Sequence, residues 1–248
     1  MPRRARQLCD SGVYHIMLRG INRQQIFEDE EDCRRFLATL ANYKTVCGYQ
    51  VYAYCLMGNH VHLLLRVGAE PLSKVFRRIG SSYVYWYNWK YERVGHLFQD
   101  RYKSETVSDD AYFLTVLRYI HQNPIKAGIC KGIDDYPYSS YNDYTGAEGA
   151  VLADTDFVLA MIGKEAFIGY HQTENEDKCL EMEETFRLTD KEAQAIIKKI
   201  SRCKNPTEFQ RLTAKERDKC IRKLKERGLS IRQICRLTGV SYAIARKD

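Results

Sequence analysis

The sequence predicts an α+β protein: a ferredoxin-like split βαβ antiparallel sheet with helices on one face, plus a C-terminal all-helical module. Three observations support this. Periodic segments follow one another as strand, helix, strand, strand, helix, strand over residues 13–107. Only Met57-Gly58-Asn59 separates the middle two strands, which favours a tight hairpin. From residue 189 onward the apolar residues recur with helical spacing.

Charge divides the chain into three parts. Residues 1–147 carry 19 Lys and Arg against 15 Asp and Glu (+4), residues 148–185 carry 2 against 10 (−8), and residues 186–248 carry 18 against 7 (+11). We therefore expect a first domain at 1–146, an acidic connector at 147–185 with one or two short helices, and a basic helical module at 186–248. A basic body joined to a more basic tail favours a polyanionic partner.

Composition narrows the class of protein further. The apolar share is 44%, which is ordinary for a globular chain, and no apolar run is long enough for a membrane span. No apolar stretch follows the basic N-terminus, so we expect no secretory signal. Nine cysteines without a Cys-x-x-Cys pair favour reduced thiols, hence a cytoplasmic protein with no membrane partner.

The first 67 residues contain three strand candidates and one helix. Residues 13–19 alternate weakly and predict a strand that carries His15. The turn after it is polar and basic, and we expect phosphate contacts from Arg19, Asn22 and Arg23. Residues 29–47 predict a helix with an acidic first turn. The apolar runs 50–56 and 60–67 predict the hairpin strands.

The next segments supply the remaining elements of the first domain. Residues 71–89 predict a helix with Pro71 near its first turn. Residues 96–107 predict the fourth strand, and we expect Arg101, Tyr102 and Lys103 in its middle to contact nucleic acid. Residues 109–123 are amphipathic, and Pro124 predicts that this helix ends about there.

Two histidines on one predicted strand form a candidate metal site. His60 and His62 are two residues apart, so on a strand both imidazoles point to one face while Val61 and Leu63 point to the other. Paired imidazoles suit a divalent metal. Six histidines in 248 residues produce roughly 0.15 such pairs by chance, so the pair alone is equally compatible with a structural role.

A second constellation strengthens the first. Tyr119 and Asn123 are four residues apart on the helix predicted at 109–123, so they share a face. A tyrosine hydroxyl and an amide oxygen on that face can both be turned toward a metal held by the histidines. A neighbouring strand could also bring His15 near the metal, although a lone strand histidine is more often structural.

The C-terminal module contains a candidate helix-turn-helix. Residues 218–227 predict a basic helix that ends at Gly228. Ser230 is a suitable N-cap for a short helix to residue 237, a turn follows at 238–240, and Ser241 starts a last segment. A plain helical bundle is the alternative, because the second helix of the motif would be short.

Four motifs in order resemble one known family. They are "VYHIMLRGINRQQIFEDEED", "YCLMGNHVHLLL", "GHLFQDRYKSE" and "LRYIHQNPIKAG", and the resemblance around them spans roughly residues 6–144. This part of the chain resembles the transposase domain of the HUH single-tyrosine endonucleases, and most closely the REP-associated tyrosine transposases. Two departures are visible: Gly58 stands where the family usually has proline, and Ile21 where asparagine is common. Neither removes a catalytic group.

The resemblance implies a chemistry. In that family the residues matching His60 and His62 bind a divalent metal, Mg²⁺ or Mn²⁺, the residue matching Asn123 completes the site, and the residue matching Tyr119 is the nucleophile. The implied function is a metal-dependent endonuclease and strand transferase that nicks single-stranded DNA near hairpins through a 5′-phosphotyrosine intermediate. The implied partner is hairpin-flanked DNA, and the chain is expected to be a monomer or a homodimer.

Two other functions stay open. One is a catalytically silent DNA-binding protein of the same fold that acts on repeats or as a regulator; the presence of all four site residues argues against it. The other is a phosphoesterase for small nucleotides with two His-x-Thr motifs. Only His171-Gln172-Thr173 fits that pattern, so this reading is weaker.

Overall fold

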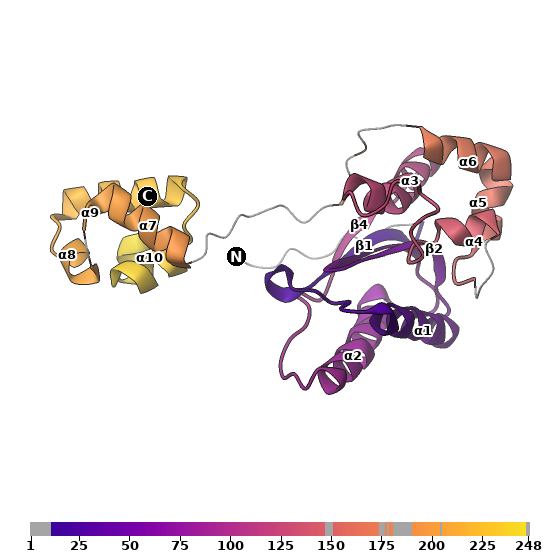
Figure 1. Cartoon of the computed structure of the whole chain (residues 1–248), viewed down its shortest axis with the longest axis horizontal. Helices are drawn as coiled ribbons and strands as arrows, with labels where there is room; N and C mark the ends of the chain where they lie inside the picture. The colour runs from indigo at the N-terminus through magenta and orange to yellow at the C-terminus, as the bar shows by residue number, and fades with distance from the viewer. Residues whose placement is uncertain are drawn as a thin grey trace. The chain divides into compact units, whose positions relative to one another are not determined.

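The computed structural model describes residues 11–146, 151–173, 177, 179–180, 190–203 and 205–246. The chain divides into two compact units, residues 1–181 and 182–248, and each is described by itself. Figure 1 shows a sheet with helices in the first unit and helices alone in the second. No helix within the described ranges combines the length and apolarity needed to cross a membrane.

A four-stranded antiparallel sheet forms the centre of the first unit. Its strands are β1 (Val13–Arg19), β2 (Gln50–Met57), β3 (His60–Arg66) and β4 (Lys103–Thr106). They lie in the order β2-β3-β1-β4, and every neighbouring pair is antiparallel. This order, with helices between β1 and β2 and between β3 and β4, is the split βαβ arrangement that the sequence predicts.

The fourth strand is shorter than predicted. We expected residues 96–107, whereas β4 starts at Lys103. Residues 97–99 instead follow the end of β1: the amide of Ile21 donates to the carbonyl of Leu97 at 2.8 Å, and the amide of Gln99 donates to the carbonyl of Arg19 at 2.8 Å. This segment therefore satisfies its backbone groups beyond the regular sheet.

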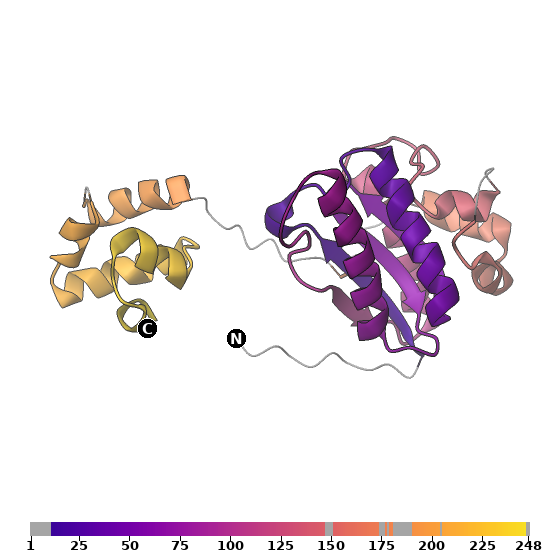
Figure 2. The same cartoon turned by 90° about the horizontal axis from the view of Figure 1, so that it is seen from below.

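Two long helices cover one face of the sheet, α1 (Glu30–Cys47) and α2 (Leu72–Lys90), as Figure 2 shows. Asp29 caps the start of α1 in a capping box with Asp32, and Gly48 ends it with a φ of 68°, a conformation that favours glycine. Leu63 and Phe36 are fully buried between the sheet and these helices.

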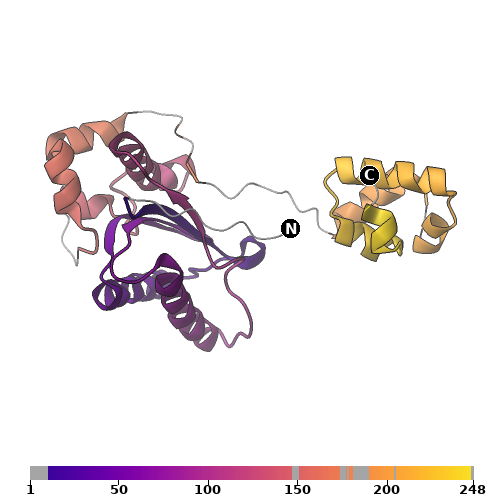
Figure 3. The same ribbon diagram turned by 180° about the vertical axis from the view of Figure 1, so that it is seen from behind.

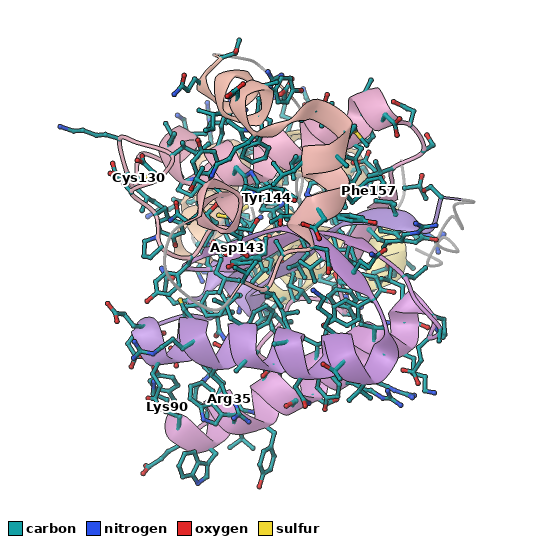
Figure 4. All side chains as sticks on the ribbon, turned by 90° about the vertical axis from the view of Figure 1, so that its right-hand side faces the viewer. Arg35, Lys90, Cys130, Asp143, Tyr144 and Phe157 are labelled. Carbon is teal, nitrogen blue, oxygen red and sulfur yellow. The ribbon has the colours of Figure 1, made fainter. Side chains whose placement is uncertain are left out.

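A half-buried cation, Lys90, joins these two helices. The Lys90 ammonium at the end of α2 lies 2.8 Å from a carboxylate oxygen of Asp29 and 2.9 Å from one of Asp32. It also lies 5.1 Å from the centre of the Trp86 ring, and the Arg35 guanidinium lies 5.7 Å from that centre. Figure 4 shows Arg35 and Lys90 on this side of the sheet.

The opposite face is covered by α3 (Asp110–Lys126), seen from behind in Figure 3. The sheet therefore has helices on both faces: α1 and α2 share one, as expected, and the tyrosine helix takes the other. The helix ends close to the predicted position, and α3 continues two residues past Pro124 to Lys126. Pro124 lacks an N–H but its carbonyl accepts from the amide of Ile129 at 2.9 Å, so the proline is accommodated in the last turn.

The segment 147–185, expected as an acidic connector with one or two short helices, contains two helices that pack onto the first unit. Its middle forms α5 (Thr155–Ile162) and α6 (Lys164–Gln172), which pack with α4 (Tyr141–Thr145) in the first unit. Phe167 is fully buried and stacks on Tyr144 with ring centroids 4.5 Å apart. Figure 4 shows Tyr144 and Phe157 in this layer, on the far side of the sheet from Lys90. The net negative charge of the segment concealed its apolar positions.

The second unit is a helical bundle around its own core. Its helices are α7 (Asp190–Ser201), α8 (Pro206–Gln210), α9 (Ala214–Glu226), α10 (Ile231–Thr238) and α11 (Tyr242–Arg246). Ser230 caps α10 in a capping box with Gln233, and Gly239 ends it. Helices α10 and α11 fall where the helix-turn-helix is predicted, and Ile234 anchors α10 in the core.

Candidate active site

His60 and His62 both point from β3 toward the face that α3 covers. Their ring centroids are 5.1 Å apart, and the rings are nearly perpendicular. Val61 and Leu63 point the other way and are fully buried under α1 and α2. The alternation of the strand thus places two imidazoles side by side, as the sequence predicts.

His62 is held by a third histidine. Nε2 of His15, on the neighbouring strand β1, lies 3.0 Å from Nδ1 of His62, and both side chains are fully buried. Nε2 of His62 has no hydrogen-bond partner within the described residues. A buried ring nitrogen without a partner is costly, and a bound cation satisfies it.

Burial also keeps these histidines neutral. Burial, and after it the positive charge of Arg19, lowers the pKa of His60 to about 4. Burial lowers the pKa of His62 well below the ordinary imidazole range, and His15 and His60 lower it further. The lone pairs of both rings are therefore available to a metal at neutral pH, because an imidazole must be deprotonated to bind one.

Tyr119 lies over the two buried histidines. Its ring centroid is 5.6 Å from that of His62 and 5.9 Å from that of His15, in edge-on geometry. The side chain is 3% exposed. Apolar residues on α3, among them Leu117 and Ile120, pack into the core and set the rotation of the helix that brings Tyr119 to this place.

Asn123 stands one turn after Tyr119. Its amide nitrogen donates to the carbonyl of Tyr119 at 3.0 Å, which leaves Oδ1 as the atom able to bind a cation. In the described part of the chain, no three His, Cys, Asp or Glu side chains are grouped to hold a metal. The predicted donors are the two imidazoles and this amide, and their nitrogen and oxygen atoms are of the kinds that bind Mn²⁺ or Mg²⁺.

A basic turn lies next to His60. Arg19 is opposite His60 in the pairing of β1 with β3, and the turn η1 (Ile21–Arg23) follows it. The amide of Gly20 donates to the carbonyl of Asn59 at 2.9 Å, which ties this turn to the β2–β3 hairpin. A Cβ at Gly20 would lie 2.2 Å from the carbonyl oxygen of Gln24, so the turn needs glycine there. Asn22 and Arg23 are exposed.

The predicted nucleic-acid contacts on the fourth strand divide into two groups. Arg101 is exposed and Lys103 is half-buried on β4, so both can reach a polyanion. Tyr102 is a correction: it is only 6% exposed, and its ring packs on Phe76 with centroids 4.8 Å apart. Little of this side chain is therefore open to the nucleic-acid contact that the sequence predicts.

Lys126 is a residue of the site that the sequence analysis missed. Its ammonium lies 5.3 Å from the centre of the Tyr119 ring. It is seven residues after Tyr119, so helical spacing would place it on the same face. The expectation that the helix ended at Pro124 removed it from consideration.

Three comparisons bear on this site. Residues 9–123 match the model of the family described as Transposase IS200 like. A relative from Haemophilus influenzae, described as a REP-associated tyrosine transposase, is 28% identical, with 43% of this chain and 68% of the relative covered. The solved structure of a REP-associated tyrosine transposase bound to a REP hairpin has a TM-score of 0.53 at 15% identity, covers 73% of this chain and 99% of its own, and shows the fold.

Proposed function

We propose that this chain, whose residues 9–123 belong to the IS200-like transposase family, is a metal-dependent endonuclease and strand transferase for single-stranded DNA. The observation that carries the proposal is the position of Tyr119 over His62 within one chain, with ring centroids 5.6 Å apart. A phenol held beside a cation-binding imidazole supplies a positioned nucleophile for phosphoryl transfer.

In the proposed reaction the hydroxyl oxygen of Tyr119 attacks a backbone phosphorus of DNA. A bond forms between this oxygen and phosphorus, and the bond between phosphorus and the 3′ oxygen breaks. The phenol loses one proton and the released 3′ hydroxyl gains one, so the step is balanced. Because the 5′-phosphotyrosine product keeps the bond energy, a second 3′ hydroxyl can reverse the step on another strand without ATP.

A bound Mg²⁺ or Mn²⁺ supplies Lewis-acid polarisation of the attacked phosphate. We assign His60 and His62, through ring nitrogens, and Asn123, through its amide oxygen, as the ligands. Lys126 places its ammonium 5.3 Å from the Tyr119 ring, where its charge favours loss of the phenol proton.

The proposed substrate is a single strand next to a hairpin. Phosphate contacts position a protein on DNA. The side chains that would contact the phosphates of this strand are those of Arg19, Asn22, Arg23, Arg101 and Lys103. The hairpin is taken from the REP-associated transposase of similar fold, which was solved bound to one. The proposed site takes its histidines and its tyrosine from one chain, so the proposal holds for a monomer and for a homodimer. The proposed place of action is cytoplasmic DNA.

A second function has its own supporting observation. Tyr119 is 3% exposed and His62 is fully buried, so DNA reaches neither without movement of the protein around them. A catalytically silent DNA-binding protein, acting on repeats or as a regulator, would keep such a closed site.

One experiment separates the two functions. End-labelled single-stranded DNA, carrying hairpins from the flanks of the gene, is incubated with the full chain and Mn²⁺ or Mg²⁺ and run on a denaturing protein gel. A labelled covalent adduct that disappears with a chelator, and in Tyr119→Phe, supports the endonuclease. Tight binding without any adduct supports the silent protein.

A further inference from the structure

A hollow of about 730 Å³ lies between α2 and the segment 96–102 that leads to β4. Ile21 of the basic turn forms part of its wall. Its volume is in the range of protein pockets that hold small ligands, about 300–1,000 Å³. The site described above does not use this hollow.

Small residues on α2 create the space. Gly80 and Ser81 face the hollow in the middle of the helix. A Cβ built on Gly80 would meet no heavy atom within 4 Å, so a larger side chain fits there without displacing protein. Glycine inside a helix is destabilising relative to alanine, and here it keeps the hollow open.

The chemistry of the hollow matches a nucleotide. Cationic side chains of Lys74, Arg77 and Arg101 line it, against one carboxylate, that of Asp100. Lys74 also pairs with Glu70 at 2.8 Å, which leaves the two arginines as the stronger attraction for a phosphate. Phe98, half-buried, adds an aromatic surface to the wall, and unpaired bases stack on such surfaces.

Backbone hydrogen bonds connect one wall of the hollow to the end of β1. The amide of Ile21 bonds to the carbonyl of Leu97 and that of Gln99 to the carbonyl of Arg19, both at 2.8 Å. Arg19 is in turn opposite His60 on the sheet. Ile21, in the wall of the hollow, comes two residues after Arg19, which corresponds to about 7 Å of extended chain.

We propose that this hollow binds an unpaired nucleotide of the DNA strand that is cut. The phosphate lies against Arg77 and Arg101, and the base lies over Phe98 toward Gly80. The inference rests on the proposed function for its substrate, since single-stranded DNA is that function's ligand. A paired base cannot enter the hollow, so the hollow favours single strands over duplexes.

The first test fills the hollow. Gly80→Phe in the full chain is expected to weaken binding of fluorescein-labelled dT12 roughly tenfold in fluorescence anisotropy, because loss of one stacked base has an effect of that order. Gly169→Phe is the matched control: this helical glycine in α6 also has no neighbour within 4 Å of its Cβ. The control should bind dT12 like the wild type. Equal affinity of Gly80→Phe and Gly169→Phe would overturn the proposal.

A second test does not depend on the folding of a variant. The wild-type chain is irradiated with a dT12 in which one thymine is 5-iodouracil, and the cross-linked peptide is sequenced. A cross-link to the peptide containing Phe98 supports the proposal, and cross-links confined to other surfaces contradict it. Arg77→Ala with Arg101→Ala should weaken dT12 binding, whereas Arg34→Ala on α1 should not.

These readouts separate this inference from the endonuclease. A Tyr119 adduct together with unchanged affinity of Gly80→Phe rejects the hollow and keeps the proposed function. Loss of affinity in Gly80→Phe without any adduct in the wild type keeps the nucleotide site and rejects catalysis. Absence of dT12 binding by the wild type rejects the nucleotide site outright.

Discussion

Nε2 of His15 lies 3.0 Å from Nδ1 of His62, although 47 residues separate them in the chain. The pairing of β1 with β3 brings them together on the face under α3. For Nε2 of His62 to bind a cation, the proton of that ring must be on Nδ1, from which it is donated to His15. Metal-binding histidines generally use their second nitrogen in this way, and it fixes the ring.

His15→Ala should therefore weaken Mn²⁺ binding by roughly 10- to 100-fold, the usual cost of removing such a partner. Calorimetric titration of the full chain with Mn²⁺ measures this independently of any reaction. His15→Gln keeps an acceptor at the position and should restore part of the affinity. Mn²⁺ binding by His15→Ala that equals the wild type would show that His15 does not orient His62.

Tyr119→Phe removes the proposed nucleophile and leaves the ring contacts with His62 and His15 in place. We expect no covalent DNA adduct, while affinity for the same DNA changes less than about twofold because no contact to the strand is lost. Tyr112→Phe is a control on the same helix, since its hydroxyl bonds to Glu105 at 2.7 Å and has no role in the proposed reaction. An adduct in Tyr119→Phe would assign the nucleophile to another residue.

A second buried histidine pair makes the first unit sensitive to acid. Nδ1 of His121 lies 2.9 Å from Nε2 of His171, and Nε2 of His121 lies 2.8 Å from the Ser140 hydroxyl. Burial lowers the pKa of His171 to about 4 and that of His121 well below its ordinary range. The unfolded chain binds these protons near pH 6.5 and the folded chain does not, so stability is lost as pH falls from about 6.5 toward 4.

The expected loss from His171 alone is about 3 kcal/mol across that window. Urea unfolding at several pH values, followed by tryptophan fluorescence, measures it in the first unit, because both tryptophans, Trp86 and Trp89, are on α2. His171→Gln should be less stable at pH 7.5 but should show a shallower fall in acid. An unchanged slope in this variant would mean that His171 titrates normally in the folded state.

Removal of residues 186–248 should weaken DNA binding and reduce its dependence on salt. The segment carries 18 Lys and Arg against 7 Asp and Glu, and each neutralised phosphate releases counterions. Cleavage of a saturating oligonucleotide should persist, because the candidate active site lies within the unit ending at residue 181. Affinity measured from 50 to 300 mM salt tests this. Equal slopes with and without the segment would exclude it from DNA contact.

The sequence by itself determined the elements and most of the candidate site. These features depend on local patterns, because neighbouring residues set the direction of each side chain. They are the alternation around His60 and His62, the hairpin at residues 57–59, and the helical spacing of Tyr119 and Asn123. The succession of strands and helices along the chain also indicated the split βαβ unit.

Only the tertiary structure decided what depends on contacts between distant residues. It showed that α3 covers the second face of the sheet and extends past Pro124, that Phe167 and its neighbours fold onto that face, and that Tyr102 is buried against Phe76. It also placed His15 against His62 and opened the hollow at Gly80. No local period encodes these features, because each results from side chains that packing brings together from separate segments.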